Sequence, residues 1–137
     1  MNTKDRSYLQ EPAIQPLEFK DFQGGRGKTA DGIPFSYHLY KSSDGVGVTT
    51  TVENHRSPAS AQKALQRKIR TAIKMIERGP KLKNKAERIG ERAVLTFALP
   101  DFHKEQAAVL WTNGQRLYYI ESLSLKHALE FEKQFYR

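Results

Sequence analysis

Cysteine is absent from this chain of 137 residues. Disulfide frameworks, thiolate nucleophiles and zinc sites built on cysteine are therefore excluded, although a cysteine-free domain fits the cytosol and the bacterial envelope alike. No apolar run approaches the roughly 18 to 20 residues of a membrane-spanning helix. Residues 1–19 contain no apolar signal-peptide core either. If the natural protein is exported, we expect its signal peptide to have been removed from this sequence.

Motifs for catalysis and for metal binding are also missing. No G-x-S-x-G nucleophile motif is present, and the run GGRGKT lacks the first glycine of a phosphate-binding loop because Phe22 stands there. None of the four histidines has H-x-x-x-H spacing, and the pair of His127 with Glu130 would need a third ligand. The sequence therefore predicts a protein that is not an enzyme and that holds no metal or cofactor.

Acidic residues are scarce in residues 63–92, a segment with eleven Lys or Arg and only three acids. Residues 1–62 carry seven bases and seven acids, and residues 93–137 carry five of each. The whole formal net charge of +8 therefore belongs to residues 63–92. Aromatic residues, which nucleic-acid-binding surfaces often use for stacking, are absent from residues 55–92.

The apolar periodicity indicates one α+β domain. Residues 35–52 alternate with period two around the turn SSDG, residues 92–99 form another apolar strand, and residues 107–120 form a hairpin. A helix precedes the last three strands, and the run SLSLKHALEFEKQFYR predicts a C-terminal helix. The order ββ-α-β-ββ-α then predicts a two-layer α+β sandwich, an antiparallel sheet of about five strands with a long central helix and a C-terminal helix. Residues 1–30 are predicted to be an extended arm and a Gly-rich loop, and residues 31–137 the single domain.

The central helix has clear start and stop signals. Ser57 suits the N-cap position and Pro58 the first helical position. Gly79 followed by Pro80 is typical of a helix end, because glycine adopts the left-handed conformation there and proline cannot continue the helix. These signals predict a helix over about residues 58–78.

On such a helix the basic side chains would form one stripe opposite the apolar face. The predicted anion-binding residues are Lys63, Arg67, Arg70, Lys74 and Arg78 on the helix, and Lys81, Lys83 and Lys85 after it. One interpretation is a solvated face that only keeps the helix soluble. The other is a surface for an anionic partner, which could be nucleic acid, an anionic membrane surface or an acidic protein. A solubilising face usually mixes charge signs, whereas only Glu77 interrupts this stripe.

The hairpin over residues 107–120 is apolar on both faces. A two-residue turn at Asn113 and Gly114 would place Trp111 opposite Arg116. A sheet with one solvated face alternates apolar with polar residues, so the second face of this hairpin needs a cover. The cover is another segment of the chain, a second copy in a homodimer, a different protein or a ligand. In the last three cases the candidate interface or pocket consists of His38, Tyr40, Leu110, Leu117 and Tyr119.

The run RIGERAVLTFALPDFHKEQAAVLWTNGQRLYYIES resembles the strand pattern of small lipoprotein-type domains of the bacterial envelope with a PsbP/Mog1-like two-layer fold. The matching positions are Ile89, Gly90, Glu91 and Ala93 in the first strand and Trp111, Gly114, Leu117 and Tyr118 in the hairpin. The resemblance implies an α–β sandwich without catalytic residues that has a binding or accessory role. It assigns no functional residue.

Taken together, the sequence favours a non-catalytic accessory or binding module. We expect it to be bacterial and associated with the cell envelope rather than the cytoplasm, and to present its basic helix to an anionic partner or surface. The alternative is a nucleic-acid-binding protein that uses the same stripe. A third possibility is an enzyme of an unrecognised type.

Overall fold

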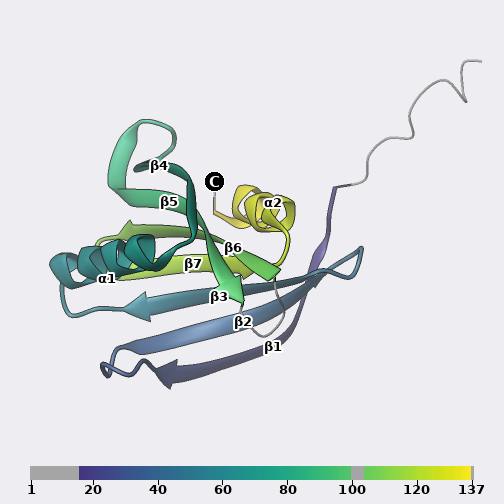
Figure 1. Ribbon diagram of the computed structural model, residues 1–137, viewed down its shortest axis with the longest axis horizontal. Coiled ribbons are helices and arrows are strands. Elements are labelled where there is room, and N and C mark those ends of the chain that lie inside the picture. Colours follow the sequence, from purple (N-terminus) through teal and green to yellow (C-terminus); the bar gives the residue numbers. More distant parts are fainter. Residues whose placement is uncertain (1–15, 100–103, 137) are drawn as a thin grey trace, which may run out of the picture.

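The computed structural model describes residues 16–99 and 104–136, which form one antiparallel sheet and two helices. The elements in chain order are β1 (Phe19–Lys28), β2 (Pro34–Ser42), β3 (Gly47–Asn54), α1 (Pro58–Thr71), β4 (Lys74–Lys83), β5 (Glu87–Leu99), β6 (Lys104–Asn113), β7 (Arg116–Ser122) and α2 (Leu125–Phe135). The seven strands lie in the order β1-β2-β3-β7-β6-β5-β4, so β1 and β4 are the two edges (Figure 1). The predicted α+β sandwich with fewer strands and a long central helix is therefore wrong, because the sheet dominates the fold and both helices are short.

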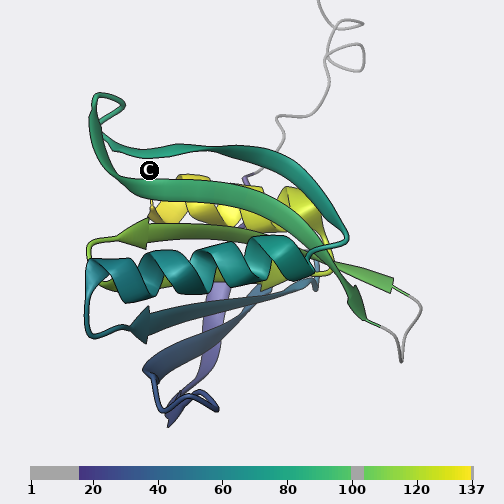
Figure 2. The ribbon, with the colours of Figure 1, turned by 60° about the vertical axis from the view of Figure 1, so that its left-hand side comes forward.

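One helix packs on each face of the sheet. Helix α1 contacts β5, β6 and β7, whereas α2 contacts β3, β6 and β7 from the other side. Figure 2 shows α1 in front of the sheet and α2 behind it. We name the two sides the α1 face and the α2 face. The described residues thus form three layers where the sequence predicted two.

Alternate residues of the central strands build two separate cores. On the α1 face, Leu65 of α1 packs with Leu95, Leu110 and Leu117. On the α2 face, Phe131 of α2 packs with Val94, Val109, Trp111 and Ile120. Each fully buried side chain of this kind stabilises the fold by about 1.5 to 3 kcal/mol. The prediction that the β6–β7 hairpin is apolar on both faces is confirmed, and the segments that cover it are the chain's own two helices.

Helix α1 begins where the sequence predicts and ends seven residues earlier. The hydroxyl of Ser57 accepts a hydrogen bond from the Ser60 N–H, and Pro58 is the first helical residue. The backbone of Ala72 is already extended, and the Ile73 N–H donates to the Thr96 carbonyl of β5. The predicted helix over residues 58–78 is therefore wrong in its last third. Most of that third belongs to β4, which pairs with β5 and supplies the hydrogen bonds that the outer edge of β5 would otherwise lack.

Strand β1 occupies a segment that the sequence predicted to be loop. Its residues pair with β2 from Phe19 to Lys28, with one irregularity beside Phe22. Glycine has a low intrinsic propensity for β-strands, but the aromatic side chains of β2 lie against the glycines of β1. A Cβ atom on Gly25 would come within 2.6 Å of the Tyr37 hydroxyl oxygen. Long-range packing therefore outweighs local propensity here. The predicted arm falls largely on residues 1–15, which lie outside the described residues.

The β6–β7 turn lies one residue later than predicted. Asn113 pairs with Arg116 and Trp111 pairs with Tyr118, so the turn residues are Gly114 and Gln115. Of these two, only Gly114 has a positive φ, of 59°. A type II′ turn needs glycine at its first central position, which explains this placement. The predicted register was therefore wrong by two residues across the hairpin. Because side chains alternate with period two, every residue still keeps its predicted face.

Candidate anion-binding surface

The structure divides the eight predicted anion-binding residues between two elements and a turn. Lys63, Arg67 and Arg70 lie on α1, Lys74, Arg78, Lys81 and Lys83 lie on β4, and Lys85 lies in the β4–β5 turn. They do not form one helical stripe, because the helix ends at Thr71. They share instead one region of the molecule, made of α1 and the β4–β5 hairpin that follows it.

Arg78 is exposed but neutralised by partners on the α1 face. Its Nε lies 2.6 Å from a carboxylate oxygen of Glu91, and its Nη2 donates to the side-chain oxygen of Gln66. The same carboxylate accepts hydrogen bonds from the side-chain amides of Gln62 and Gln66. This network fastens the edge hairpin to α1. Arg78 therefore has a structural partner already and contributes little free charge to the surface.

Lys81 belongs to a second network, on the α2 face. Glu132 of α2 is fully buried and receives two hydrogen bonds from Arg92, of 2.8 and 2.7 Å. The Lys81 Nζ lies 3.5 Å from the same carboxylate and 4.6 Å from the centre of the Trp111 ring. Hydrogen bonding to Glu132 raises the pKa of the Arg92 guanidinium, so this cation stays charged. Glu77, which is more than half exposed, gives Arg92 a second partner at 3.1 Å.

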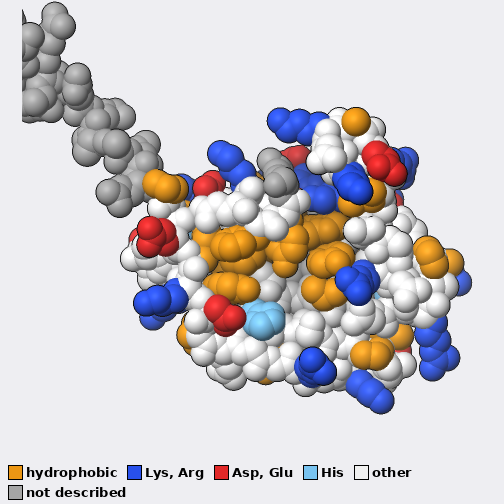
Figure 3. All heavy atoms as spheres, turned by 180° about the vertical axis from the view of Figure 1, so that it is seen from behind, with side chains coloured by type: hydrophobic (Ala, Val, Ile, Leu, Met, Phe, Trp, Pro, Cys, Tyr) orange, Lys and Arg blue, Asp and Glu red, His pale blue; other side chains and the backbone are white. Residues whose placement is uncertain are grey.

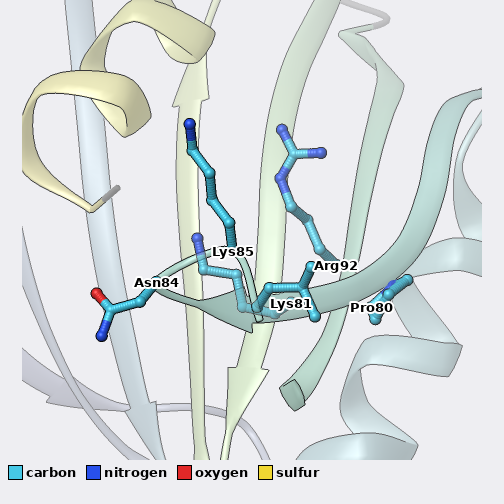
Figure 4. A pocket seen from close by; sticks show the side chains of 6 residues that line it. Pro80, Lys81, Asn84, Lys85 and Arg92 are labelled. Carbon is cyan, nitrogen blue, oxygen red and sulfur yellow. The ribbon is translucent and has the colours of Figure 1, made fainter. Parts of the chain in front are cut away.

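A hollow of about 540 Å³ opens beside this second network. It is lined by Pro80, Lys81, Leu82, Asn84, Lys85 and Arg92. Figure 4 shows the side chains of Lys81, Lys85 and Arg92 directed to the same side of the hairpin. Both Asn84 and Lys85 have positive φ, of 50° and 62°, and they are the central residues of a turn in which the Ala86 N–H donates to the Lys83 carbonyl. Of these three cations, Lys81 and Arg92 are already engaged by Glu132, so Lys85 is the cation that this hollow offers to an anionic group.

The remaining cations of this region are exposed to solvent, except for the half-buried Lys68 of α1, whose Nζ lies 4.5 Å from the centre of the Tyr119 ring. Lys63, Arg70, Lys74, Lys83, Lys85 and Arg88 are exposed and form no ion pair among the described residues. Arg67 lies 3.6 Å from Asp31, but both side chains are more than half exposed, so solvent screens the pair. Lys68, Arg88 and Arg92 were not among the predicted residues, although the charge count of residues 63–92 includes them. Figure 3 shows Lys and Arg side chains around the margin of the α2 face, whose middle is a band of hydrophobic side chains.

The second predicted set, the interface or pocket residues, is not brought together. Leu110 and Leu117 are buried beneath α1, and Tyr119 lies on the same face. Tyr40 packs with the core on the α2 face, and His38, two residues earlier on β2, lies on that face as well. The His38 ring is half exposed and lies 3.3 Å from Asp21. The sheet therefore separates the five residues into two groups.

A buried polar chain that sequence reasoning missed links β3 to α1. The Nδ1 of His55 lies 2.9 Å from the Ser60 hydroxyl, and its Nε2 lies 2.9 Å from the Glu53 carboxylate. The Tyr119 hydroxyl donates to the other oxygen of Glu53, and burial raises the pKa of Tyr119. Ser60 also lies in the first turn of α1, where its N–H binds Ser57. The close spacing of E-x-H and S-P-x-S was the only signal of this chain in the sequence.

A hollow of about 330 Å³ adjoins this polar chain. It is lined by Thr29, Asp31, Ile33, Glu53, His55, Ala64, Arg67, Lys68 and Thr71. Ser60 is not part of the lining, so the hydroxyl that contacts the imidazole does not face this hollow. The chain therefore fits a cross-link between β3 and the start of α1 better than a nucleophile with its base.

Three further observations bear on function: they concern clusters of metal ligands, membrane-spanning helices and similarity to known proteins. The described residues contain no group of three His, Cys, Asp or Glu side chains that would hold a metal ion. Neither helix in the described part of the chain has the length and apolar character to cross a membrane. No protein-family model matches the chain, and no curated protein or solved structure was found to be similar to it.

Proposed function

We propose that this protein is a non-catalytic binding module that presents α1 and the β4–β5 hairpin to an anionic macromolecular partner. One observation carries the proposal. The segment that holds the whole net charge of +8 folds into one helix and one edge hairpin, with six exposed cations that have no ion pair among the described residues. We name the surface of these six residues, Lys63, Arg70, Lys74, Lys83, Lys85 and Arg88, the basic surface.

Helix α1 does not have the mixed charge signs of a typical solubilising face, because it contains no acidic residue. A solubilising helix face usually carries glutamate four residues before lysine, because such pairs stabilise a helix by about 0.2 to 0.5 kcal/mol each. Helix α1 has no acidic residue in its first turn and carries basic residues in its last turn. The hairpin adds further lysines beside it. Concentrated charge of one sign attracts and orients a partner of the opposite sign.

Retention on immobilised heparin, polyglutamate and double-stranded DNA tests this proposal. We compare the wild-type chain with the triple variant Lys74→Glu, Lys83→Glu and Lys85→Glu. The matched control is Lys20→Glu, Lys41→Glu and Lys133→Glu, which changes the net charge equally at exposed lysines of β1, β2 and α2. We expect the first variant to elute at much lower salt than the control, because the lost contacts are concentrated where the partner binds.

Equal shifts for both triple variants would contradict the proposal, because retention would then depend only on net charge. Stronger retention on DNA than on heparin of equal charge density would identify nucleic acid as the partner. Stronger retention on polyglutamate would identify an acidic protein.

A further inference from the structure

Strand β4 exposes apolar side chains among its cations. Seven large hydrophobic side chains are exposed in the described part of the chain, and four of them lie within ten consecutive residues: Ile73, directly before β4, and Met75, Ile76 and Leu82 on the strand. Their exposed fractions are 54%, 50%, 38% and 41%. A concentration of this kind marks an interaction site more often than scattered single residues do.

The backbone of β4 also has an open side. The strand pairs with β5 on one side only, and it is the last strand in the sheet order. An edge strand presents unpaired N–H and C=O groups that another extended segment can use. Peptide recognition by strand addition depends on such an edge, with side-chain contacts giving specificity.

The charges of β4 determine which segment can pair with it. Glu77, Arg78 and Lys81 already have ion-pair partners within the fold. The exposed charges left for a partner are therefore those of Lys74 and Lys83, both cationic. A second copy of this strand would bring lysines such as Lys74 and Lys83 against other cations, and like charges directly opposite each other destabilise a sheet. A strand that carries carboxylates would gain from the same side chains. The cations therefore disfavour pairing between copies of this chain and favour an acidic partner.

Two features limit how far a partner strand can extend. Pro80 has no N–H, and proline on an edge strand commonly blocks further pairing. The register shift beside Ile76 twists the strand locally. The segment from Lys74 to Gly79 is therefore the longest part of the edge without proline.

We propose that an acidic extended segment of a partner protein, in which carboxylates alternate with apolar residues, adds as a strand along Lys74–Gly79. This inference rests on the proposed function and names its partner class and binding mode. The apolar residues of the partner contact Met75 and Ile76, and its carboxylates contact Lys74.

Two labelled peptides of equal composition test the binding mode. One alternates glutamate and valine over eight positions, and the other has four glutamates followed by four valines. Only the alternating peptide places carboxylates and apolar side chains on opposite faces of a strand. We expect it to bind more tightly than the block peptide by fluorescence anisotropy. We also expect slower amide hydrogen exchange in β4, because strand addition protects outward N–H groups.

Two substitutions at exposed edge hydrophobics provide the matched comparison. Met75→Glu on β4 should weaken binding of the alternating peptide by about tenfold or more, because it removes an apolar contact and adds repulsion. Phe22→Glu on β1, where Phe22 is 62% exposed, should leave binding unchanged. Circular dichroism and thermal melting of both variants check that they fold as the wild type does.

These experiments distinguish failure of strand addition from failure of the proposed function. Equal binding of the two peptides, or no added protection in β4, would overturn strand addition, while retention on heparin or polyglutamate would show that the proposed function survives. Loss of that retention as well would contradict both proposals. A salt-resistant dimer that Met75→Glu dissociates would overturn the inference, because a second copy would then occupy the edge.

Discussion

The two edges of the sheet are built from different kinds of residue. β1 contains three glycines, and ring side chains of β2 lie against all three, Gly24, Gly25 and Gly27. β4 contains one glycine, Gly79, and exposes Met75 and Ile76 between its cations. The β1 edge therefore packs against the rings of its own neighbour and exposes one large hydrophobic side chain, Phe22, whereas the β4 edge exposes Met75, Ile76 and Leu82. An edge of the second kind is available to a partner, and the comparison is why we assign binding to β4.

Helix α2 fastens the two edges by different chemistry, through consecutive residues. Phe131 lies 5.0 Å from Phe19, at the start of β1, and 4.7 Å from Tyr40 of β2, measured between ring centres. Glu132 holds Arg92 and Lys81 on the β4 side. Apolar packing thus secures the glycine-rich edge, and buried ion pairs secure the basic edge. Because buried charges depend on their partners, the β4 edge should be the more sensitive to single substitutions.

The largest expected effect is that of Glu132→Gln. The substitution keeps the side-chain shape but removes the fully buried carboxylate that Arg92 and Lys81 share. We expect the free energy of unfolding to fall by about 3 to 5 kcal/mol, because both cations lose the buried carboxylate that they share. Chemical denaturation with urea measures it. The control is Asp21→Asn at the exposed pair with His38 on the β1 edge, for which we expect a change below about 1 kcal/mol. Similar losses for the two variants would remove the distinction between the edges.

A smaller loss is expected from Gly90→Ala on β5, beside the basic edge. A Cβ atom there would come within 1.8 Å of the Thr112 carbonyl oxygen, and a backbone atom cannot move aside as a flexible side chain does. We expect destabilisation of about 2 to 4 kcal/mol. Gly79→Ala on β4 is the matched control, since no atom lies within 4 Å of its Cβ position. Thermal melting should show little change for Gly79→Ala, and a comparable loss for both would mean that close packing is not the reason.

The smallest effect is expected midway between the edges, at Glu121 of β7. Burial raises the pKa of this carboxyl, the nearby Lys68 partly lowers it, and Glu53 raises it again. A carboxyl with a raised pKa in the folded state binds its proton more readily there than in the unfolded chain. Its ionised form therefore destabilises the fold above the folded-state pKa, and the penalty disappears below the unfolded-state value of about 4.3.

Glu121→Gln should accordingly stabilise the protein at pH 8 by up to about 1 kcal/mol and have little effect near pH 4. Melting temperatures recorded across this pH range measure the difference. Glu87→Gln, at an exposed position of the basic edge, should show no such dependence. A gain that is constant with pH would contradict burial of the charge as its cause.

Local chemistry predicted the parts of the fold that depend on neighbouring residues. The start of α1 at Ser57 and Pro58 is confirmed, because capping uses groups within one turn of the helix. The alternation of residues 107–120 assigned every side chain of the β6–β7 hairpin to the correct face. The resemblance to envelope domains stays a prediction, and so does the location that it implies.

The edge strands could not be predicted in the same way. Almost every residue of β4 is exposed on both faces, so the strand has no apolar alternation and its bases continue the helical spacing of α1. Strand β1 also lacks a recognisable strand pattern, because its glycines have no side chains to alternate and its packing comes from the rings of β2. The pairing of Arg78 with Glu91, and of Lys81 with Glu132, joins positions 13 and 51 residues apart and leaves no local signal.

By itself the sequence determined that one short segment carries the surplus positive charge and that the central hairpin is apolar on both faces, because composition and alternation are local properties. Only the tertiary structure decided that the charge lies along a sheet edge, that a helix covers each face, and which cations remain exposed. Edge pairing and charge neutralisation depend on residues distant in the chain, so they follow from the fold and not from the pattern.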